Sequence, residues 1–362
     1  MDQRIDAIQR SCAAKPGITS FGGGLPSENL FPRRQLADAA HKVISRANGA
    51  ALQYGWPEGQ KVLREFVSKR LRARGVDVTA DDIIITSGAQ QALALTVSAL
   101  TFPGMRMHVG AETYPAALEL FRSKNVTPTL DVDEAHACYA MQSVCNPRGL
   151  GMSVERHAEI FTSGLPIIID EAYAELRFDG HLERPLICCA RDRAWLIGTF
   201  SKTLAPGLRV GWLVPPRQNR EQILQKKQDM DLQTGSLSQS VLAEFLLRFD
   251  FDAHLVAART EYQRRADTLV AAVLKHFPQW EFDEPQGGFS VFARTNRTGD
   301  DAKFLAEAAS HGVSFDPGRL FRSTNQSSPM ALRLCYSNVK EDAIDDAMAR
   351  LAKAWKSFAP PC

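Results

Sequence analysis

The chain has 362 residues, of which 44% are hydrophobic and 23% charged, a composition typical of globular proteins and long enough for two domains with separate cores. The 43 basic and 41 acidic residues leave a formal net charge of only +2, and no long run of one sign occurs, so nothing favours nucleic-acid binding. Residues 1–12 lack the apolar stretch of a secretory signal, and no segment approaches the roughly 18 apolar residues of a membrane span, so we expect a cytoplasmic protein with no membrane partner. The seven cysteines include no CxxC pair, which favours free thiols and no metal site.

Short apolar runs alternate with helical patterns between residues 82 and 214. Strands are predicted at 82–86, 105–109, 126–133, 139–144, 167–169, 195–199 and 210–214, and helices at 89–100, 114–123 and 154–161. This alternation predicts an α/β fold whose central sheet is mainly parallel. Ligands of such sheets bind beyond the carboxyl ends of the strands, so polar residues that follow strands are candidates for a site.

One connection in this region is unusually short. Only Glu134–Cys138 separate the strand predicted at 126–133 from the strand predicted at 139–144. Parallel neighbours normally need a crossover of a dozen or more residues. Either the first strand is shorter than its pattern, or the crossover is extended and has no helix.

The pattern becomes helical after Pro215-Pro216, at 220–231 and again at 238–275. The remainder mixes strands at 288–293 and 331–337 with helices at 301–311 and 342–355. This part predicts a second, smaller α+β domain. No internal repeat or long linker separates the two parts, so we expect them to pack tightly.

The first candidate for chemistry is the turn at residues 86–90, which joins a predicted strand to a predicted helix. Gly88 makes the turn, and the free N–H groups at the start of the helix suit a phosphate group. Gln90 adds a side-chain donor. Many such turns contain glycine and small polar residues, so an ordinary turn explains this segment equally well when it is taken alone.

The second candidate is Asp170, which follows the buried run Pro166–Ile169 directly. An aspartate at the end of a buried strand can pair with a protonated ring nitrogen. Tyr173, three residues further on, could reach a neighbouring ring oxygen. A helix cap or a surface carboxylate is an equally good local interpretation of Asp170.

The third candidate is the segment 198–212, GTFSKTLAPGLRVGW. Lys202 follows a strand, the hydroxyls of Thr199 and Ser201 precede it, and Arg209 lies seven residues beyond it. A lysine condenses with an aldehyde to give a Schiff base, and hydroxyls with an arginine suit a phosphate dianion. A lysine in a loop is usually a solvated charge, but the flanking apolar strands disfavour simple exposure here.

The run SKTLAPGLRVGW at 201–212 resembles the cofactor-lysine signature of class I/II aminotransferases, the fold-type I pyridoxal-phosphate enzymes. Further segments resemble the family in its own order: FGGGLP at 21–26, LFP at 30–32, YGWPEG at 54–59 with Leu63-Arg64, SGAQQAL at 87–93, ETYPAAL at 112–118, CNPRG at 145–149, DEAYAEL at 170–176, DLQTGSLSQ at 231–239, PQGGFSVF at 285–292 and LRLCYSNV at 332–339. Within the family, these segments are most similar to the branch that contains 2-aminoadipate, kynurenine and aromatic aminotransferases, and to the enzyme-like domain of MocR-type regulators.

This resemblance implies a fold-type I transferase, with a large domain whose mostly parallel sheet is sandwiched by helices and a smaller α+β domain. It divides the chain into an amino-terminal arm and segment joining the small domain at 1–49, a large pyridoxal-phosphate-binding domain at 50–255 and a small carboxyl-terminal domain at 256–362. The implied partners are an α-amino acid and a 2-oxo acid. The implied cofactor is pyridoxal 5′-phosphate, with no metal.

The resemblance also assigns roles. Lys202 would form the Schiff base and move the proton between the substrate α-carbon and cofactor C4′, while Asp170 would keep the pyridine nitrogen protonated. Asn146 and Tyr173 would bond the ring hydroxyl oxygen. The other implied cofactor contacts are Tyr114 on the ring face and Ser87, Gly88, Ala89, Gln90, Thr199, Ser201 and Arg209 around the phosphate.

On the substrate side, Arg333 would grip the α-carboxylate in a bidentate fork, beside Asn146 and Gly24. Tyr54 would reach the phosphate of the neighbouring subunit, which implies a homodimer with shared active sites. Taken singly, Tyr54 and Tyr114 would more often be packing aromatics and Arg333 a surface or ion-paired residue. The ordered set of segments is what favours the functional interpretation.

Three departures from the family pattern are visible. The usual NPTG turn is Asn146-Pro147-Arg148-Gly149, which adds a charge near the site. The usual histidine of the DLHT-type element is Gln233. The short Glu134–Cys138 connection removes a helix that relatives normally have.

Two alternatives to transamination remain. The same cofactor supports a lyase, decarboxylase, racemase or oxidase, because the outcome depends on the substrate pose. A MocR-like effector-binding domain is a second alternative, disfavoured because no winged-helix segment precedes residue 21. A dinucleotide site is disfavoured because residues 22–24 do not form GxGxxG after a first strand. A dicarboxylate substrate would need a dedicated cation, for which Arg33, Arg34 and Arg148 are candidates, and we expect a neutral or aromatic substrate.

Overall fold

A computed structural model describes residues 17–46, 49–324 and 329–358. The helices are α2 Arg33–Ile44, α3 Lys61–Ala73, α4 Ala89–Leu100, α5 Pro115–Ser123, α6 Val154–Thr162, α7 Arg220–Asp231, α8 Ser236–Arg248, α9 Phe251–His276, α10 Asp301–Ser310 and α11 Glu341–Phe358. The strands are β1 Thr19–Ser20, β2 Ile84–Thr86, β3 Arg106–His108, β4 Thr127–Thr129, β5 Ala137–Ala140, β6 Ile167–Asp170, β7 Ala194–Thr199, β8 Gly211–Val214, β9 Glu281–Phe282, β10 Ser290–Arg294, β11 Val313–Ser314, β12 Asp316–Pro317 and β13 Ala331–Cys335.

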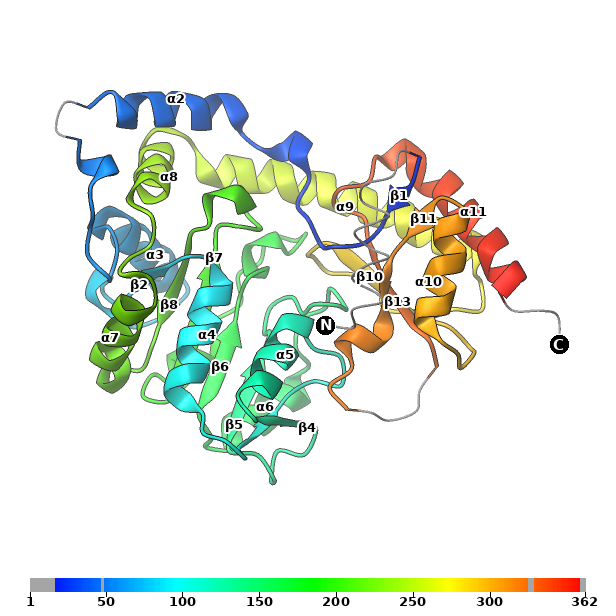
Figure 1. Cartoon of the computed structure of the whole chain (residues 1–362), viewed down its shortest axis with the longest axis horizontal. Helices are drawn as coiled ribbons and strands as arrows, with labels where there is room; N and C mark the ends of the chain where they lie inside the picture. Colours follow the sequence, from blue (N-terminus) through cyan, green and yellow to red (C-terminus); the bar gives the residue numbers. More distant parts are fainter. Residues whose placement is uncertain (1–16, 47–48, 325–328, 359–362) are drawn as a thin grey trace.

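The large sheet has the strand order β2-β8-β7-β6-β5-β3-β4. Only β8 runs antiparallel to its neighbours, so the other six strands share one direction. The strands β5, β6 and β7 are buried along their whole length, which explains their unbroken apolar sequences. Helices cover this sheet (Figure 1). The predicted α/β class with a mostly parallel central sheet is confirmed.

Both explanations offered for the short connection before β5 apply. β4 has only three residues, against the eight predicted, and residues 130–136 contain no helix. β4 and β5 pair with opposite sides of β3, so the chain passes from one side of β3 to the other.

The strand predicted at 139–144 lies too far along the chain, because β5 ends at Ala140. The residues that follow are buried, but their polar groups bond to loops instead of a neighbouring strand. Gln142 donates to the Arg184 carbonyl at 2.9 Å and accepts from the Leu186 N–H at 2.8 Å. The Cys145 N–H donates to the Leu150 carbonyl. Burial alone therefore gives the wrong end for this strand.

The helical region predicted at 238–275 is two helices rather than one. Phe249 is extended, with φ −120° and ψ 149°, and it ends α8. Asp250 then caps α9 by accepting a hydrogen bond from the Ala253 N–H at 2.9 Å. An aspartate at this position restarts a helix by satisfying its free N–H groups.

The carboxyl-terminal part holds a smaller sheet with the order β12-β13-β10-β9, packed with α10 and α11 beside the large sheet (Figure 1). β1 pairs in parallel with β11, so residues 19–20 join this smaller part. A nearly continuous hydrophobic core runs through both parts. The boundary proposed at 255 falls inside α9, which spans the two parts, and residues 1–16 of the proposed arm lie outside the described residues.

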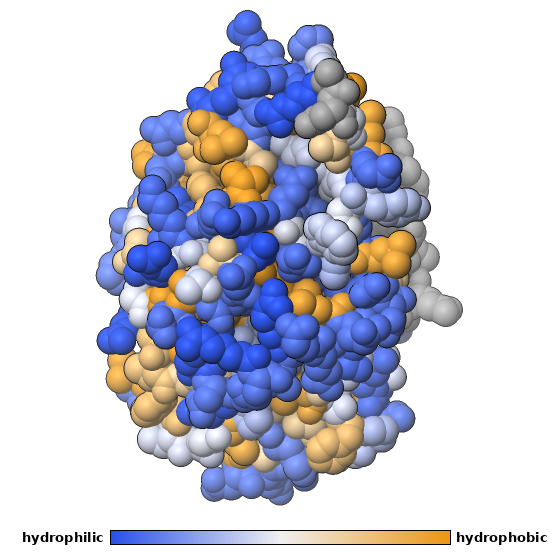
Figure 2. Space-filling model, turned by 90° about the vertical axis from the view of Figure 1, so that its left-hand side faces the viewer, coloured by the Kyte–Doolittle hydropathy of each residue, from blue (hydrophilic) through white to orange (hydrophobic). Residues whose placement is uncertain are grey.

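The surface is mixed in character. Figure 2, which looks onto the side at the left of Figure 1, shows hydrophilic side chains interrupted by several apolar patches. Among the described residues, no helix has both the length and the apolar character needed to cross a membrane.

Candidate functional site

Gly88 and Lys202 lie in the loops after β2 and β7, and Asp170 is the last residue of β6. These three strands are parallel, so their carboxyl ends lie at one edge of the sheet. That edge is where ligands of α/β sheets bind. The fold therefore brings together the three segments that the sequence singled out.

The start of α4 forms a cradle for an anion. Gly88 has φ +84°, and a Cβ atom at this position would lie 2.8 Å from Nη2 of Arg209. No side chain caps the helix start, so its first N–H groups stay available for a ligand. Arg209 itself donates from Nη2 to the Ser87 carbonyl at 3.3 Å. Free N–H groups, the positive end of the helix and a guanidinium together fit a phosphate dianion.

Two hydroxyl-bearing residues from the lysine loop form a hydrogen-bonded pair beside this cradle. Thr199 and Ser201 are buried, and their hydroxyl oxygens lie 3.0 Å apart. The Ser201 N–H also donates to the Thr199 hydroxyl at 3.1 Å. Both fit the predicted phosphate site.

Two other predicted phosphate contacts are differently engaged. The Ser87 hydroxyl donates to Oδ2 of Asp231 at 3.0 Å, so it turns toward α7. Gln90 is exposed and accepts a hydrogen bond from the Tyr114 hydroxyl at 3.3 Å. Ala89 contributes its backbone as the first residue of α4.

Asp170, the last residue of β6, is 4% exposed. Oδ2 accepts a hydrogen bond from the Tyr139 hydroxyl at 2.9 Å, and Oδ1 accepts one from the Ala172 N–H at 3.0 Å. Burial raises the pKa of this carboxyl group. A buried carboxylate is stabilised by a cationic partner, and a protonated ring nitrogen meets that need.

Lys202 lies among groups from three separate parts of the chain. Its Nζ donates to the Gly24 carbonyl at 3.0 Å and lies 5.6 Å from the ring centre of Tyr173 and 5.7 Å from that of Phe289. Burial, together with the nearby charge of Arg333, lowers the pKa of Lys202 to about 8. A larger share of this amine is therefore neutral near pH 8 than for an exposed lysine, as nucleophilic attack on an aldehyde requires.

Arg333, on β13, points its guanidinium at the same space. Nη1 donates to Oδ1 of Asn146 at 2.9 Å, and Nε donates to Oδ2 of Asp316 at 2.9 Å, which also accepts from Nη2. These bonds use three of the five N–H groups and leave one on each terminal nitrogen. Two such donors match the two oxygens of a carboxylate.

Gly24 keeps the space beside these donors open. It has φ +59°, and a Cβ atom there would lie 3.4 Å from both terminal nitrogens of Arg333. Any side chain would crowd the carboxylate fork. Its carbonyl meanwhile accepts the hydrogen bond from Lys202, so this glycine lies between the amine and the guanidinium.

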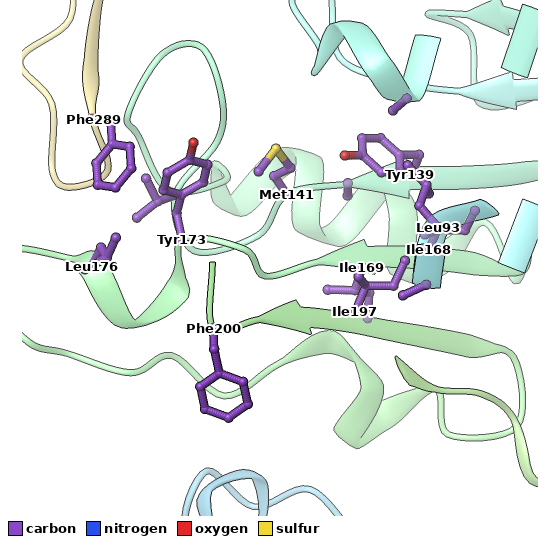
Figure 3. Close-up of a cluster of buried hydrophobic side chains, with 14 of the residues drawn as sticks. Leu93, Tyr139, Met141, Ile168, Ile169, Tyr173, Leu176, Ile197, Phe200 and Phe289 are labelled. Carbon is purple, nitrogen blue, oxygen red and sulfur yellow. The ribbon is translucent and has the colours of Figure 1, made fainter. Parts of the chain in front are cut away.

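Two aromatic residues line the site. The ring of Tyr173 lies 5.2 Å from that of Phe289 in an edge-to-face contact, and Figure 3 shows the two side by side.

The phenols of Tyr173 and Tyr114 are both protonated. Burial raises the pKa of Tyr173, and it raises the pKa of Tyr114 to about 12. Both phenols therefore stay protonated near neutral pH and can donate hydrogen bonds.

Three further residues that the sequence singled out are exposed or already paired. The side chain of Tyr54 is 77% exposed. Gln233 accepts a hydrogen bond from the Gly55 N–H and donates to the Ser236 hydroxyl at 3.0 Å, so it holds the Tyr54 loop against α8. Arg148 forms a salt bridge of 2.7 Å with Asp283.

Sequence reasoning missed two residues. Tyr139 on β5 supports Asp170, and Asp316 on β12 supports Arg333. A tyrosine in a buried strand indicates that its hydroxyl has a hydrogen-bond partner. Which residue is the partner can be known only from the order of the strands in the sheet. Asp316 has no clear local signal, because the segment Val313–Pro317 (VSFDP) mixes apolar and polar residues.

The residues present fit pyridoxal phosphate. The Gly88–Arg209 cradle suits the phosphate, Asp170 suits a protonated pyridine nitrogen, and Lys202 suits the aldehyde. Arg333 suits the carboxylate of an amino acid. Among the described residues, no group of histidine, cysteine or acidic side chains could hold a metal ion.

Comparison with known proteins gives a consistent result. The family model described as "Aminotransferase class I and II" matches residues 26–351. A 2-aminoadipate transaminase from Thermus thermophilus is 30% identical, with 95% of this chain and 91% of that protein covered. An uncharacterized HTH-type transcriptional regulator of Escherichia coli, YdcR, is 28% identical over 88% of this chain and 72% of its own.

The fold also matches a solved structure. It is that of LysN, an α-aminoadipate aminotransferase of Thermus thermophilus, in complex with N-(5′-phosphopyridoxyl)-L-leucine. The TM-score is 0.88 and the identity 28%, with 98% of this chain and 96% of that chain covered.

Proposed function

The chain belongs to the class I and II aminotransferase family, and on this basis we propose that it moves an amino group from an α-amino acid to a 2-oxo acid with pyridoxal 5′-phosphate attached to Lys202. The observation that carries the proposal is the convergence at Lys202, whose amine bonds to Gly24 and has a lowered pKa. Gly24 in turn borders the guanidinium of Arg333.

The chain's own groups have separate tasks in this reaction. The cofactor, when bound, supplies an aldehyde and an electron-withdrawing ring that accepts the electron pair left at the substrate α-carbon. The α4 start, Thr199, Ser201 and Arg209 hold the phosphate, and Asp170 holds the ring nitrogen in its protonated form. Tyr139 orients Asp170 through the 2.9 Å hydrogen bond.

Proton movement falls to Lys202. Its Nζ would take the proton from the substrate α-carbon and deliver it to C4′ of the cofactor, whereas return of a proton to the α-carbon would give racemisation. Asn146 and Tyr173 donate to the ring hydroxyl oxygen. Arg333 holds the α-carboxylate with its two remaining N–H groups, which fixes the α-carbon beside Lys202.

We also propose a neutral or aromatic substrate side chain. Of the candidate cations, Arg148 is already paired with Asp283, and Arg33 and Arg34 lie on the exposed face of α2. A cavity of about 310 Å³ beside Tyr114 and Asn146 has Met141 and Leu150 in its wall. Its charged wall residues Glu112, Arg148 and Arg156 each form an ion pair within the protein, so a neutral side chain suits it.

The proposed assembly is a cytoplasmic homodimer with shared sites. Tyr54 and Trp56 are 77% and 76% exposed, and Leu52 lies beside them with an exposed side chain. Aromatic residues clustered on a surface are typical of protein interfaces. The proposal places Tyr54 against the phosphate of the partner subunit.

A screen of amino donors tests the function. The purified protein with pyridoxal phosphate and 2-oxoglutarate is incubated with single amino acids, and the new 2-oxo acid and glutamate are measured together. Equal amounts of the two products are expected with at least one neutral donor. Release of ammonia, carbon dioxide or the mirror-image amino acid instead would indicate another reaction of the same cofactor.

The similarity to the regulator YdcR favours one second candidate, an effector-binding domain. Such a domain would bind cofactor and ligand without turnover. Binding of an amino acid with no product for any donor would support this candidate over the enzyme.

A further inference from the structure

The carboxylate-binding guanidinium has an anionic partner inside the protein. Asp316 and Arg333 are paired across β12 and β13, and both are buried, at 4% and 8% exposed. Oδ2 of Asp316 accepts hydrogen bonds from Nε and Nη2 of Arg333. Arg333 thus already faces one carboxylate when the substrate arrives with another.

Asp316 also ties this pair to the glycine loop. Its Oδ1 and Oδ2 lie 3.2 and 3.0 Å from the Gly23 N–H. Gly24, the next residue, borders the Arg333 fork and accepts from Lys202. The aspartate therefore sits at the junction of the loop, the arginine and the amine.

A buried arginine without an anion is costly, because its charge has lost its hydration. In a site with such an arginine, a substrate that lacks a carboxylate leaves the charge uncompensated, so only amino acids are accepted. Here Asp316 compensates the charge before any substrate binds. A substrate with a carboxylate therefore gains less binding free energy from Arg333, and a substrate without a carboxylate loses less.

We propose that Asp316 is a specificity-determining residue that weakens the preference of this site for α-carboxylates, so that the enzyme also accepts primary amines of the same side chain. This inference rests on the proposed amino transfer and names its wider substrate class. Asp316 acts through Arg333, whose orientation and net charge it sets. The reaction with an amine is the same exchange: the amine loses its amino group and becomes an aldehyde, and the 2-oxo acid gains the amino group.

One substitution distinguishes a role of Asp316 as a counter-charge from a role in orienting Arg333, because the two roles predict opposite changes in carboxylate affinity. Asp316→Asn keeps the size and an oxygen acceptor for Arg333 but removes the negative charge. If Asp316 only positions the guanidinium, the variant should bind carboxylates equally well or more weakly. If it is a counter-charge, the variant should bind carboxylates more tightly, by about tenfold, because the repulsion between Asp316 and the bound carboxylate is removed.

Two measurements on the holoprotein follow from this. Calorimetry with 3-phenylpropionate, a carboxylate that has no amino group to react, measures the contact with Arg333 without turnover. The ratio of kcat/KM for phenylalanine to that for 2-phenylethylamine measures selectivity. Both the affinity and the ratio should rise about tenfold in Asp316→Asn. Asp345→Asn removes a charge from the exposed pair with Lys275 and should change neither.

Asp316→Ser, also neutral and smaller, serves where the asparagine variant does not fold, with circular dichroism as the check. Unchanged or weaker binding of 3-phenylpropionate in a folded neutral variant overturns the proposal. The calorimetric result decides where the two measurements differ, because it isolates the carboxylate contact. It also stands when no amino donor is turned over, so failure of the proposed function is distinguishable from failure of this inference.

Discussion

A methyl group at Gly88 should weaken cofactor binding as well as the fold. The residue has φ +84°, and an added Cβ would lie 2.8 Å from Nη2 and 3.2 Å from Cζ of Arg209. With ψ 170°, this is a backbone conformation that essentially only glycine adopts, and it costs an alanine about 1–3 kcal/mol. The guanidinium must also move from its place beside the α4 start, and loss of one charge-assisted hydrogen bond to the phosphate costs about 1.5–3 kcal/mol.

The second cost converts to roughly 10- to 150-fold weaker binding of pyridoxal phosphate. The assay is a fluorescence titration of the cofactor-free Gly88→Ala protein with pyridoxal phosphate, alongside urea unfolding. Gly104→Ala is the matched control, because Gly104 has φ +88° but no atom within 4 Å of the added Cβ. Both variants should lose stability, and only Gly88→Ala should lose affinity for pyridoxal phosphate. A Gly88→Ala protein with the affinity of the Gly104→Ala control would refute the phosphate cradle.

Three more predictions follow from the site. Arg333→Lys keeps the charge but loses the planar fork, so kcat/KM for amino acids should fall by the equivalent of about 1.5–3 kcal/mol while the visible absorbance of the bound cofactor stays the same; unchanged kinetics for every donor would place the carboxylate elsewhere. Because the pKa of Lys202 is lowered from 10.5 to about 8, the rate of covalent cofactor attachment should rise between pH 7 and 9 and then level off, whereas a rise continuing to pH 10.5 would show an ordinary exposed amine. Mixing inactive Lys202→Ala chains with impaired Tyr54→Phe chains should restore activity toward half of wild type per heterodimer, since one site then carries neither change; no rescue would mean that Tyr54 acts within its own chain.

The alternation of strands and helices was sufficient to predict the central sheet, because buried parallel strands have continuous apolar sequences. The turns at Gly88 and Lys202 were recognisable for a related reason. Each directly follows a strand, so sequence order alone brings them to one edge of the sheet. The end of a strand was harder to predict from the sequence, because the residues after Ala140 are as buried as those of β5 but form hydrogen bonds to loops.

The carboxylate side of the site was not derivable in the same way. Asp316 and Arg333 are 17 residues apart and meet only because β12 and β13 pair in one particular register. Tyr139 and Asp170 likewise meet because β5 lies beside β6. Nothing local in the sequence fixes either pairing. The direction of the Ser87 hydroxyl, toward Asp231, depends on where α7 packs.

The central claim is that Lys202 carries the cofactor, and chemical trapping tests it most directly. The holoprotein is reduced with borohydride, digested, and its peptides mapped by mass spectrometry. The pyridoxyl label should lie on Lys202 alone, and Lys202→Ala should carry no label and no visible absorbance. A stoichiometric label on another lysine, or an undiminished label in Lys202→Ala, would contradict the account.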